Sequence, residues 1–203
     1  MANEPEKTRR YRKRRRAEQE AETRRRITEA AVKLHGTIGP AKTTVSGIAR
    51  EAGVQRATVY RHFPDENAIY NACTSHYNAL HPPPDLERWA GIRDPEERLR
   101  VALAEVYAFY AETRQMLEST GRDADRVPAV GRAVAAMGAY LEAAREVLLR
   151  GRPERGRARK RASAAIGHAL AFGTWRSLVR EQGLDGEDAV ALMASLVSAA
   201  AGR

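Results

Sequence analysis

The sequence is poor in the residues that define several classes of protein. Its single cysteine, Cys73, excludes an internal disulfide and a metal site built from several cysteines, and it is expected to be a small buried hydrophobe. The uncharged, largely apolar stretches 162–175 and 189–201 are shorter than the roughly 18 residues that a membrane-spanning helix needs. A secretory signal would require a short apolar segment after the basic start, and the sequence has none. We therefore expect a soluble, cytoplasmic protein without a membrane partner.

Signatures of enzymes are also missing. The sequence contains no Gly-rich phosphate loop and no nucleophile elbow, and its five histidines are scattered, with no cluster of further ligands around them. No pair of a base and a nucleophile stands out. We expect no enzymatic activity, no cofactor and no bound metal.

Positive charge, by contrast, is abundant and unevenly placed. The 203 residues include 35 basic and 26 acidic side chains, which gives a formal charge of +9. Residues 1–76 hold 16 basic and 9 acidic side chains, whereas residues 77–203 hold 19 and 17. The first third of the chain therefore has the charge of a polyanion-binding region, and the rest is nearly neutral.

The pattern of apolar residues predicts an all-α protein of about nine helices. Alanine is frequent, apolar residues recur at spacings of three and four, and β-branched and polar residues show no sustained alternation. Pro82-Pro83-Pro84 is a stiff stop between helices. We place a domain boundary there, between an N-terminal domain over 17–81 and a C-terminal helical domain over 82–203.

Residues 44–63, TVSGIAREAGVQRATVYRHF, have the pattern of a helix-turn-helix motif. Gly53 can adopt the left-handed conformation that the turn between the two helices needs. The inner positions are apolar, at Ile48, Ala49, Ala52, Val54 and Val59. The second helix then exposes donor-bearing side chains suited to phosphates and base edges, namely Gln55, Arg56, Thr58, Arg61 and His62.

Residues 24–73 resemble the DNA-binding domain of the TetR family of bacterial transcriptional regulators. The matching positions are Ile27, Ala30-Ala31, Leu34, Gly39, Thr43-Thr44-Val45, Ile48-Ala49, Glu51-Ala52-Gly53-Val54, Tyr60, His62-Phe63 and Ile69. The resemblance implies a three-helix DNA-binding domain followed by a helical domain that binds a ligand and dimerises. It also implies that Tyr60 contacts phosphate. Thr44, at a helix N-terminus, is expected to contact phosphate as well, Gln55, Arg56 and Thr58 are expected to read bases, and Arg61 and His62 to contact phosphates.

Three positions depart from the family pattern. Gln55 replaces a small capping hydroxyl, and Gly47 replaces an acid that would complete a capping box with Thr44. Glu66 stands, beside Asp65, where a phosphate-contacting lysine is common. Two carboxylates near a DNA backbone would repel it, so the contact made by this part of the motif is expected to be unusual.

Two basic clusters lie outside the motif. Residues 1–16 carry eight Arg or Lys side chains, and such a block repels itself, so we expect it to be disordered alone. On DNA it either enters a minor groove or only strengthens non-specific binding. The cluster at 150–161 is expected to be a solvated connection, with a second anion contact as the alternative.

The C-terminal domain carries more apolar surface than one core can bury. The expected helices 162–180 and 187–201 are apolar on several faces, which predicts a homodimer built on these helices. The candidates for a ligand site are Phe109, Tyr110, Met116, Met137, Tyr140, Phe172 and Trp175, with His168 as a polar anchor.

The sequence thus predicts a sequence-specific transcriptional regulator. We expect a homodimeric repressor that binds a near-palindromic operator in double-stranded DNA and leaves it when a small-molecule effector shifts the helix at 65–81. The alternative is an architectural protein that uses its basic tail to bind DNA without sequence preference.

Overall fold

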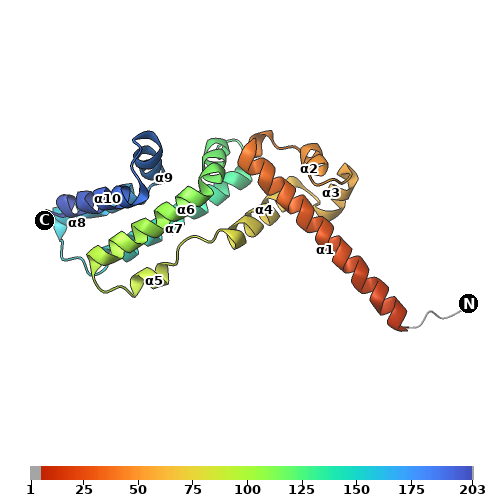
Figure 1. The fold of residues 1–203 in the computed structure, drawn as a ribbon, viewed down its shortest axis with the longest axis horizontal. Helices are drawn as coiled ribbons and strands as arrows, with labels where there is room; N and C mark the ends of the chain where they lie inside the picture. Colours follow the sequence, from red (N-terminus) through yellow and green to blue (C-terminus); the bar gives the residue numbers. More distant parts are fainter. Residues whose placement is uncertain (1–5, 203) are drawn as a thin grey trace, which may run out of the picture. The chain divides into compact units, whose positions relative to one another are not determined.

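The computed structural model describes residues 6–202, with side chains from Arg10 onward. This range contains ten α-helices and no strand, which confirms the predicted all-α fold (Figure 1). The helices are α1 (Glu6–Thr37), α2 (Val45–Glu51), α3 (Arg56–His62), α4 (Glu66–Leu80), α5 (Leu86–Ala90), α6 (Pro95–Asp123), α7 (Pro128–Leu149), α8 (Gly156–Leu170), α9 (Phe172–Trp175) and α10 (Gly186–Ala201). A 3-10 turn at Pro40–Lys42 and a π-helical turn at Arg176–Glu181 complete the set.

The chain divides into two compact units. The first contains the residues up to Leu80 and a later segment, Glu118–Gly131, and the second contains His81–Leu117 and the residues from Arg132 on. The sequence places a boundary beside Leu80, where α4 ends before the three prolines. It gives no sign that the segment 118–131 returns to the first unit, because that return depends on contacts between distant residues.

The first unit packs α1–α4 around one small core. Ile27, Ala31, Val59 and Phe63 are fully buried in it, and Ile48 is 3% exposed. Of the five inner positions that the motif predicts, Ile48, Ala49, Ala52 and Val59 are buried and Val54 is half-buried, so helical periodicity identified the core face of α2 and α3.

Helix α1 begins at Glu6, eleven residues before the expected start at Ala17, so the prediction of a disordered segment is wrong for residues 6–16. Residues 1–5 of that segment lie outside the described residues. Neither Gly nor Pro interrupts the chain between Glu6 and His35, and arginine, alanine and glutamate all favour helix. Ion pairs between Arg14 and Glu18 (2.8 Å) and between Arg16 and Glu20 (3.1 Å) offset part of the self-repulsion.

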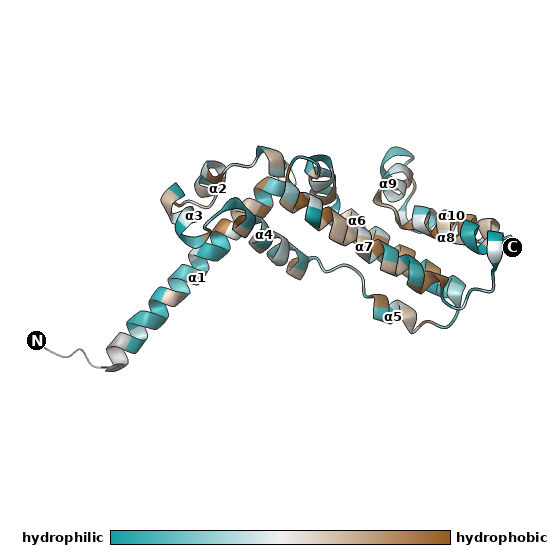
Figure 2. Ribbon diagram, turned by 180° about the vertical axis from the view of Figure 1, so that it is seen from behind, coloured by the Kyte–Doolittle hydropathy of each residue, from teal (hydrophilic) through white to brown (hydrophobic). Residues whose placement is uncertain are grey.

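The second unit packs α5–α10 around a larger core that includes Trp89, Leu103, Leu148 and Ile166, all 0% exposed. Asp94 caps helix α6, because its carboxylate accepts hydrogen bonds from the backbone N–H groups of Glu96 and Glu97, both at 3.2 Å. The five-residue helix α5 was not predicted. Brown, apolar stretches mark the buried parts of α6 and α7 in Figure 2.

Two expectations for the last third of the chain are wrong. The helix expected over 162–180 stops at Leu170, because Ala171 is extended (φ −70°, ψ 134°), and α9 follows it. The basic cluster at 150–161 is not simply a solvated connection. The Arg152 side chain is fully buried, 3.1 Å from a Glu96 carboxylate oxygen, and it donates to the Leu148 carbonyl.

Candidate nucleic-acid interface

The N-terminus of α2 is capped as the sequence predicts. Thr44 is exposed, and its hydroxyl accepts a hydrogen bond from the Gly47 backbone N–H at 3.0 Å. The threonine O–H remains available as a donor, as the expected phosphate contact requires. The missing acid at Gly47 therefore removes only the reciprocal half of a capping box.

The turn between α2 and α3 depends on Gly53, whose φ is +64°. The backbone N–H of Val54 donates to the Ala49 carbonyl at 2.9 Å and closes the end of α2. A left-handed residue here costs a β-carbon-bearing side chain roughly 1 kcal/mol or more. The turn is thus fixed by one glycine, as the motif predicts.

Helix α3 buries Val59 and turns its polar side chains outward. Gln55, Arg56, Tyr60 and Arg61 are exposed. Thr58 and His62 are half-buried. The seven predicted DNA-contacting residues therefore lie on α3 or just before α2 and α3. The exposed ones, Arg56, Tyr60 and Arg61 on α3 with Gln55 at its N-cap, form a surface rich in hydrogen-bond donors.

Arg56 and Tyr60 contact each other one turn apart on that surface. The Arg56 guanidinium donates to the Tyr60 hydroxyl at 3.1 Å and lies 5.4 Å from the centre of the ring. The hydrogen bond to Tyr60 raises the pKa of Arg56 above its ordinary value. Tyr60 is 43% exposed, so it is accessible to a phosphate.

The two carboxylates after α3 have different roles. Asp65 accepts a hydrogen bond from the Ala68 backbone N–H at 2.8 Å and so caps α4. Glu66 is exposed in the first turn of that helix. Sequence reasoning treated both as sources of repulsion and missed the cap, although an Asp two residues beyond Phe63 and before a helical run is a standard cap signal.

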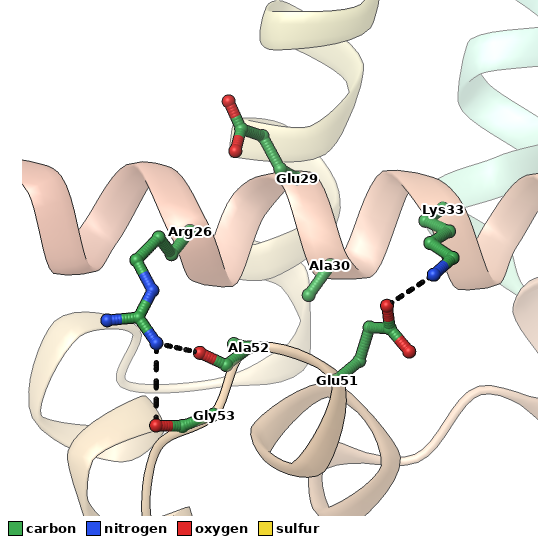
Figure 3. A pocket seen from close by; sticks show the side chains of 7 residues that line it. All are labelled: Arg26, Glu29, Ala30, Lys33, Glu51, Ala52 and Gly53. Atoms are coloured by element: carbon green, nitrogen blue, oxygen red, sulfur yellow. Dashed lines mark hydrogen bonds and ion pairs between the residues drawn. The ribbon is translucent and has the colours of Figure 1, made fainter.

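Two arginines of α1 hold the ends of the helix-turn-helix, and sequence reasoning missed both. Arg24 donates to the His62 carbonyl at 2.6 Å, at the end of α3, and its guanidinium lies 4.1 Å above the Phe63 ring. Arg26 donates to the carbonyls of Ala52 and Gly53, in the turn before α3 (Figure 3). Helix α3 is therefore anchored to α1 at both ends.

A hollow of about 350 Å³ lies beside the Arg26 contact and is open to solvent. Its charged groups satisfy one another rather than a ligand. Lys33 binds the Glu51 carboxylate at 2.6 Å, as Figure 3 shows, and Glu29 pairs with Arg25 at 2.6 Å. We assign this hollow to the packing of α1 on α2 and the turn.

Cys73 is buried, as expected, and faces His35. Its sulfur lies 3.5 Å from the His35 Nδ1, and the His35 ring stacks on Tyr70 with 4.8 Å between ring centres. Burial raises the pKa of the Cys73 thiol to about 12 and lowers the pKa of His35 to about 4. Both groups are therefore neutral near pH 7, which does not favour a redox role for the thiol.

The segment 118–131 is joined to the first unit by two buried polar side chains. The Ser119 hydroxyl donates to the His35 carbonyl, and the Asp123 carboxylate accepts from the Ala41 backbone N–H at 3.0 Å. Burial raises the pKa of Asp123, but the Ala41 N–H and Arg122 outweigh it and leave the pKa below its ordinary value. The last turns of α6 therefore bind directly to the loop before α2.

Four of the eight predicted ligand-site residues meet in the second unit. Tyr110 contacts Phe172 edge-on, with 5.3 Å between ring centres, and lies 6.0 Å from both Phe109 and Trp175. Phe172 and Trp175 stack at 5.4 Å. Tyr110 is 1% exposed and donates to the Leu170 carbonyl. These rings form the packed core beneath the break at Ala171.

The other four predicted residues are spread more widely. Tyr140 donates to the Pro84 carbonyl at 2.8 Å. His168 is exposed on α8, within 3.5 Å of the Thr174 hydroxyl. Met116 and Met137 are half-buried on α6 and α7. The aromatic cluster is therefore the part of the predicted set that the structure brings together.

The part of the chain that the structure describes holds no group of three His, Cys, Asp or Glu side chains placed to bind a metal ion. No helix in residues 6–202 is long and apolar enough to cross a membrane.

Comparison with known proteins agrees with this geometry. Residues 27–73, which span the second half of α1 through the middle of α4, match the model of the bacterial regulatory proteins of the tetR family. No protein with curated annotation matches the chain.

Several solved structures share the fold over most of their length. A TetR-like transcriptional regulator from Rhodococcus sp. RHA1 is 20% identical over 87% of this chain and 93% of its own, with a TM-score of 0.63. NalD, the secondary repressor of the MexAB-OprM multidrug efflux pump in Pseudomonas aeruginosa, is 20% identical over 90% and 96%, with a TM-score of 0.59. FadR from Bacillus subtilis, solved with stearoyl-CoA, is 19% identical over 86% and 96%, with a TM-score of 0.57.

At these identities the solved structures establish the fold, with an N-terminal helix-turn-helix domain and a C-terminal helical domain. The matched helices carry the family signature itself. Residues 27–73 therefore form a domain similar to the DNA-binding domain of the tetR family of bacterial regulatory proteins, and the rest of the chain shares the fold of the solved regulators.

Proposed function

We propose that this regulator is a homodimeric repressor that binds one operator sequence and is released from it by a small molecule. The observation that carries the proposal is the exposed face of α3, where Gln55, Arg56, Tyr60 and Arg61 present donors while Val59 anchors the helix in the core. A helix of this kind fits the major groove, which is wide enough to admit it.

Each predicted contact residue has a role in this proposal. Gln55, Arg56 and Thr58 lie in the first turn of α3 or just before it, and they read base edges. Thr44, Tyr60, Arg61 and His62 contact phosphates and set the position of the helix on the duplex. The Arg56 guanidinium leaves the Tyr60 hydroxyl oxygen when it binds a guanine, whereas the Tyr60 O–H can donate to a phosphate in either state.

The homodimer is proposed on α8 and α10, which pack against each other. Helix α10 buries Met193 and Val197 and exposes Leu192 (47%) and Leu196 (42%), one turn apart on another face. A second copy would cover these leucines. Two recognition helices related by a twofold axis bind half-sites about one helical turn of DNA apart, so the operator is a near-palindrome.

Dimerisation is tested by replacing both leucines with lysine. The variant with Leu192→Lys and Leu196→Lys is expected to sediment as a monomer. The matched control is Leu80→Lys, since Leu80 is 60% exposed on α4 and belongs to the other unit. If the double-lysine variant and the Leu80→Lys control sediment with the same mass, the dimer does not form through this face.

The effector is proposed to enter beside the aromatic cluster of Phe109, Tyr110, Phe172 and Trp175. It acts only through a difference in its affinity for the DNA-bound and free states. The end of α6 supports a route to the motif, because Ser119 and Asp123 attach it to the backbone around His35 and Ala41. The related fold of FadR holds stearoyl-CoA, so a long-chain acyl-CoA is the first probe to try.

Selection of bound fragments from random duplex DNA tests the central claim. The wild-type protein is expected to recover one near-palindromic sequence, and Arg56→Ala and Thr58→Ala to relax the preference at single base positions, each costing roughly 1–3 kcal/mol. Arg100→Ala is the control, since Arg100 is an exposed arginine of the second unit. Binding without any consensus, lost at moderate salt, would instead indicate an architectural DNA-binding protein.

A further inference from the structure

The N-terminal half of α1 extends beyond the helix-turn-helix as a basic helix. Six of the seven residues from Arg10 to Arg16 are Arg or Lys, and every residue in this basic segment is exposed. Figure 1 shows α1 running past α2 and α3 and continuing well beyond them, and Figure 2 shows that this extension is mostly hydrophilic. Seven helical residues make about two turns, so the cations surround the axis rather than occupying one face.

We infer that the basic segment (residues 10–16) is a second DNA-contacting element, which binds the phosphate backbone of the operator duplex at a fixed distance from α3. The inference rests on the proposed function, because the duplex is the one that α3 occupies. Two turns of helix span about 10 Å, and duplex DNA carries one negative charge per ~1.7 Å of its axis. The six cations thus meet a comparable number of phosphate charges.

The fixed distance follows from the way that α1 is attached. Arg24 binds the end of α3 and Arg26 binds the turn before it, so α1 is held at two points relative to the recognition helix. No Gly or Pro separates Arg24 from the basic segment. At 1.5 Å per residue, Arg16 lies about 12 Å and Arg10 about 21 Å along the helix axis from Arg24. These distances correspond to at most roughly 4 and 6 base pairs of duplex.

An acidic segment separates the two contacts. Glu18, Glu20 and Glu22 follow the basic segment with no basic residue between them. Glu18 and Glu20 pair with Arg14 and Arg16, and Glu22 pairs with Arg25 at 2.7 Å, a pairing that lowers the pKa of Glu22. These carboxylates repel phosphate, so the protected backbone should form two zones rather than one continuous zone.

A membrane surface is a poorer partner for this helix. Interfacial helices need an apolar face opposite the charged one. Tyr11 is the one large apolar side chain among residues 10–23, and charges occupy every side of its turn. The chemistry therefore fits the phosphates of a duplex better than a lipid layer.

Hydroxyl-radical footprinting of the full-length protein on its selected duplex tests the inference. The wild type is expected to protect the zone under α3 and a second, separate zone within about 4–6 base pairs of it. A glutamine variant removes the charge while keeping helix propensity. It should lose the second zone, retain the first, and lower the slope of log affinity against log salt by roughly 3–5. Its substitutions are Arg10→Gln, Arg12→Gln, Lys13→Gln, Arg14→Gln, Arg15→Gln and Arg16→Gln.

Two further variants separate charge from rigidity. Ala17→Gly with Ala21→Gly leaves the charge unchanged but weakens the helix between the contacts, so the salt slope should persist while the second zone becomes diffuse. Glu18→Gln with Glu20→Gln frees Arg14 and Arg16 from their carboxylates and should tighten binding at least severalfold.

The outcomes are distinguishable. A wild type that protects the first zone alone overturns the inference and leaves the proposed function intact. Absence of the first zone overturns the proposed function. A sharp second zone in the double-glycine variant refutes the fixed distance. Binding of the wild type to anionic phospholipid vesicles, combined with no second zone, assigns the helix to membranes instead.

Discussion

Replacing Gly39 by alanine should destabilise the first unit strongly. Gly39 has φ 95° and ψ 154°, a region that residues with a β-carbon avoid at a cost of about 1–3 kcal/mol. A β-carbon there would also lie 2.6 Å from the Asp123 Oδ2 and closer still to the Arg122 guanidinium. The Arg122 side chain is 55% exposed and can swing away, whereas that of Asp123 is 3% exposed and cannot.

The displaced carboxylate loses its hydrogen bond from the Ala41 N–H, which is worth about 1.5–3 kcal/mol for a charged acceptor. The two effects together predict a loss of about 3–5 kcal/mol in the free energy of unfolding, a large part of the 5–15 kcal/mol typical of a domain. Urea denaturation followed by circular dichroism measures it.

A matched glycine gives the opposite expectation. Gly121 lies in α6, and a β-carbon there would meet nothing within 4 Å, so Gly121→Ala should stabilise the protein by about 0.5–1 kcal/mol. In an Asp123→Ala background the cost of Gly39→Ala should fall to the conformational part, about 1–3 kcal/mol. A cost below about 1 kcal/mol for Gly39→Ala alone would refute the reasoning, because the loop would then tolerate another conformation.

Three further perturbations have expected outcomes. Burial lowers the pKa of His35 to about 4, so between pH 6.5 and 4 the unfolded chain binds a proton that the native chain does not. The free energy of unfolding should therefore decrease, by up to about 3 kcal/mol, as the pH is lowered from 6.5 to 4. His35→Gln should flatten that part of a stability-against-pH curve, whereas a change at exposed His168 should not. Arg152→Ala should cost about 3–5 kcal/mol in thermal unfolding, because it leaves the carboxylates of Glu96 and Glu154 without their buried guanidinium; a cost within experimental error would show that the pair is dispensable. Gln55 makes no side-chain bond at the start of α3, so Gln55→Ser should add about 0.5–1 kcal/mol of stability, and calorimetry showing no gain would mean that the helix start is already satisfied.

The helix-turn-helix was predictable because its physical constraints are local. Gly53 marks the turn, Thr44 marks the start of α2, and Ile48 and Val59 mark the core faces, and each of these is decided by residues within one or two turns. Periodicity and capping report such constraints directly.

Arginines that bind back onto the protein were not predictable in the same way. Arg24, Arg26 and Arg152 belong to basic runs, and sequence reasoning treats such runs as solvated or as DNA-facing surface. In the structure Arg24 and Arg26 donate to backbone carbonyls of segments distant in sequence. Arg152 is buried, where it donates to the Leu148 carbonyl and to the Glu96 carboxylate. The local sequence does not show which arginine of a basic run binds the protein itself and which ones stay in solvent.

The break at Ala171 has a similar origin. Alanine is a strong helix former, so local propensity favours an unbroken helix there. The chain nevertheless leaves helical geometry, which places Phe172 and Trp175 against Tyr110. The burial of three aromatic rings outweighs the propensity of one residue, and sequence spacing does not reveal that balance.

The contact between Arg56 and Tyr60 bears on the selectivity of the proposed reading of DNA by α3. A free arginine side chain loses about 2 kcal/mol of rotamer entropy when it becomes ordered. Here the hydroxyl and ring of Tyr60 restrict the Arg56 rotamers before any duplex arrives. Part of that entropy is therefore lost on folding rather than on binding, and a base that cannot replace the Tyr60 hydroxyl as an acceptor leaves the guanidinium with its original partner.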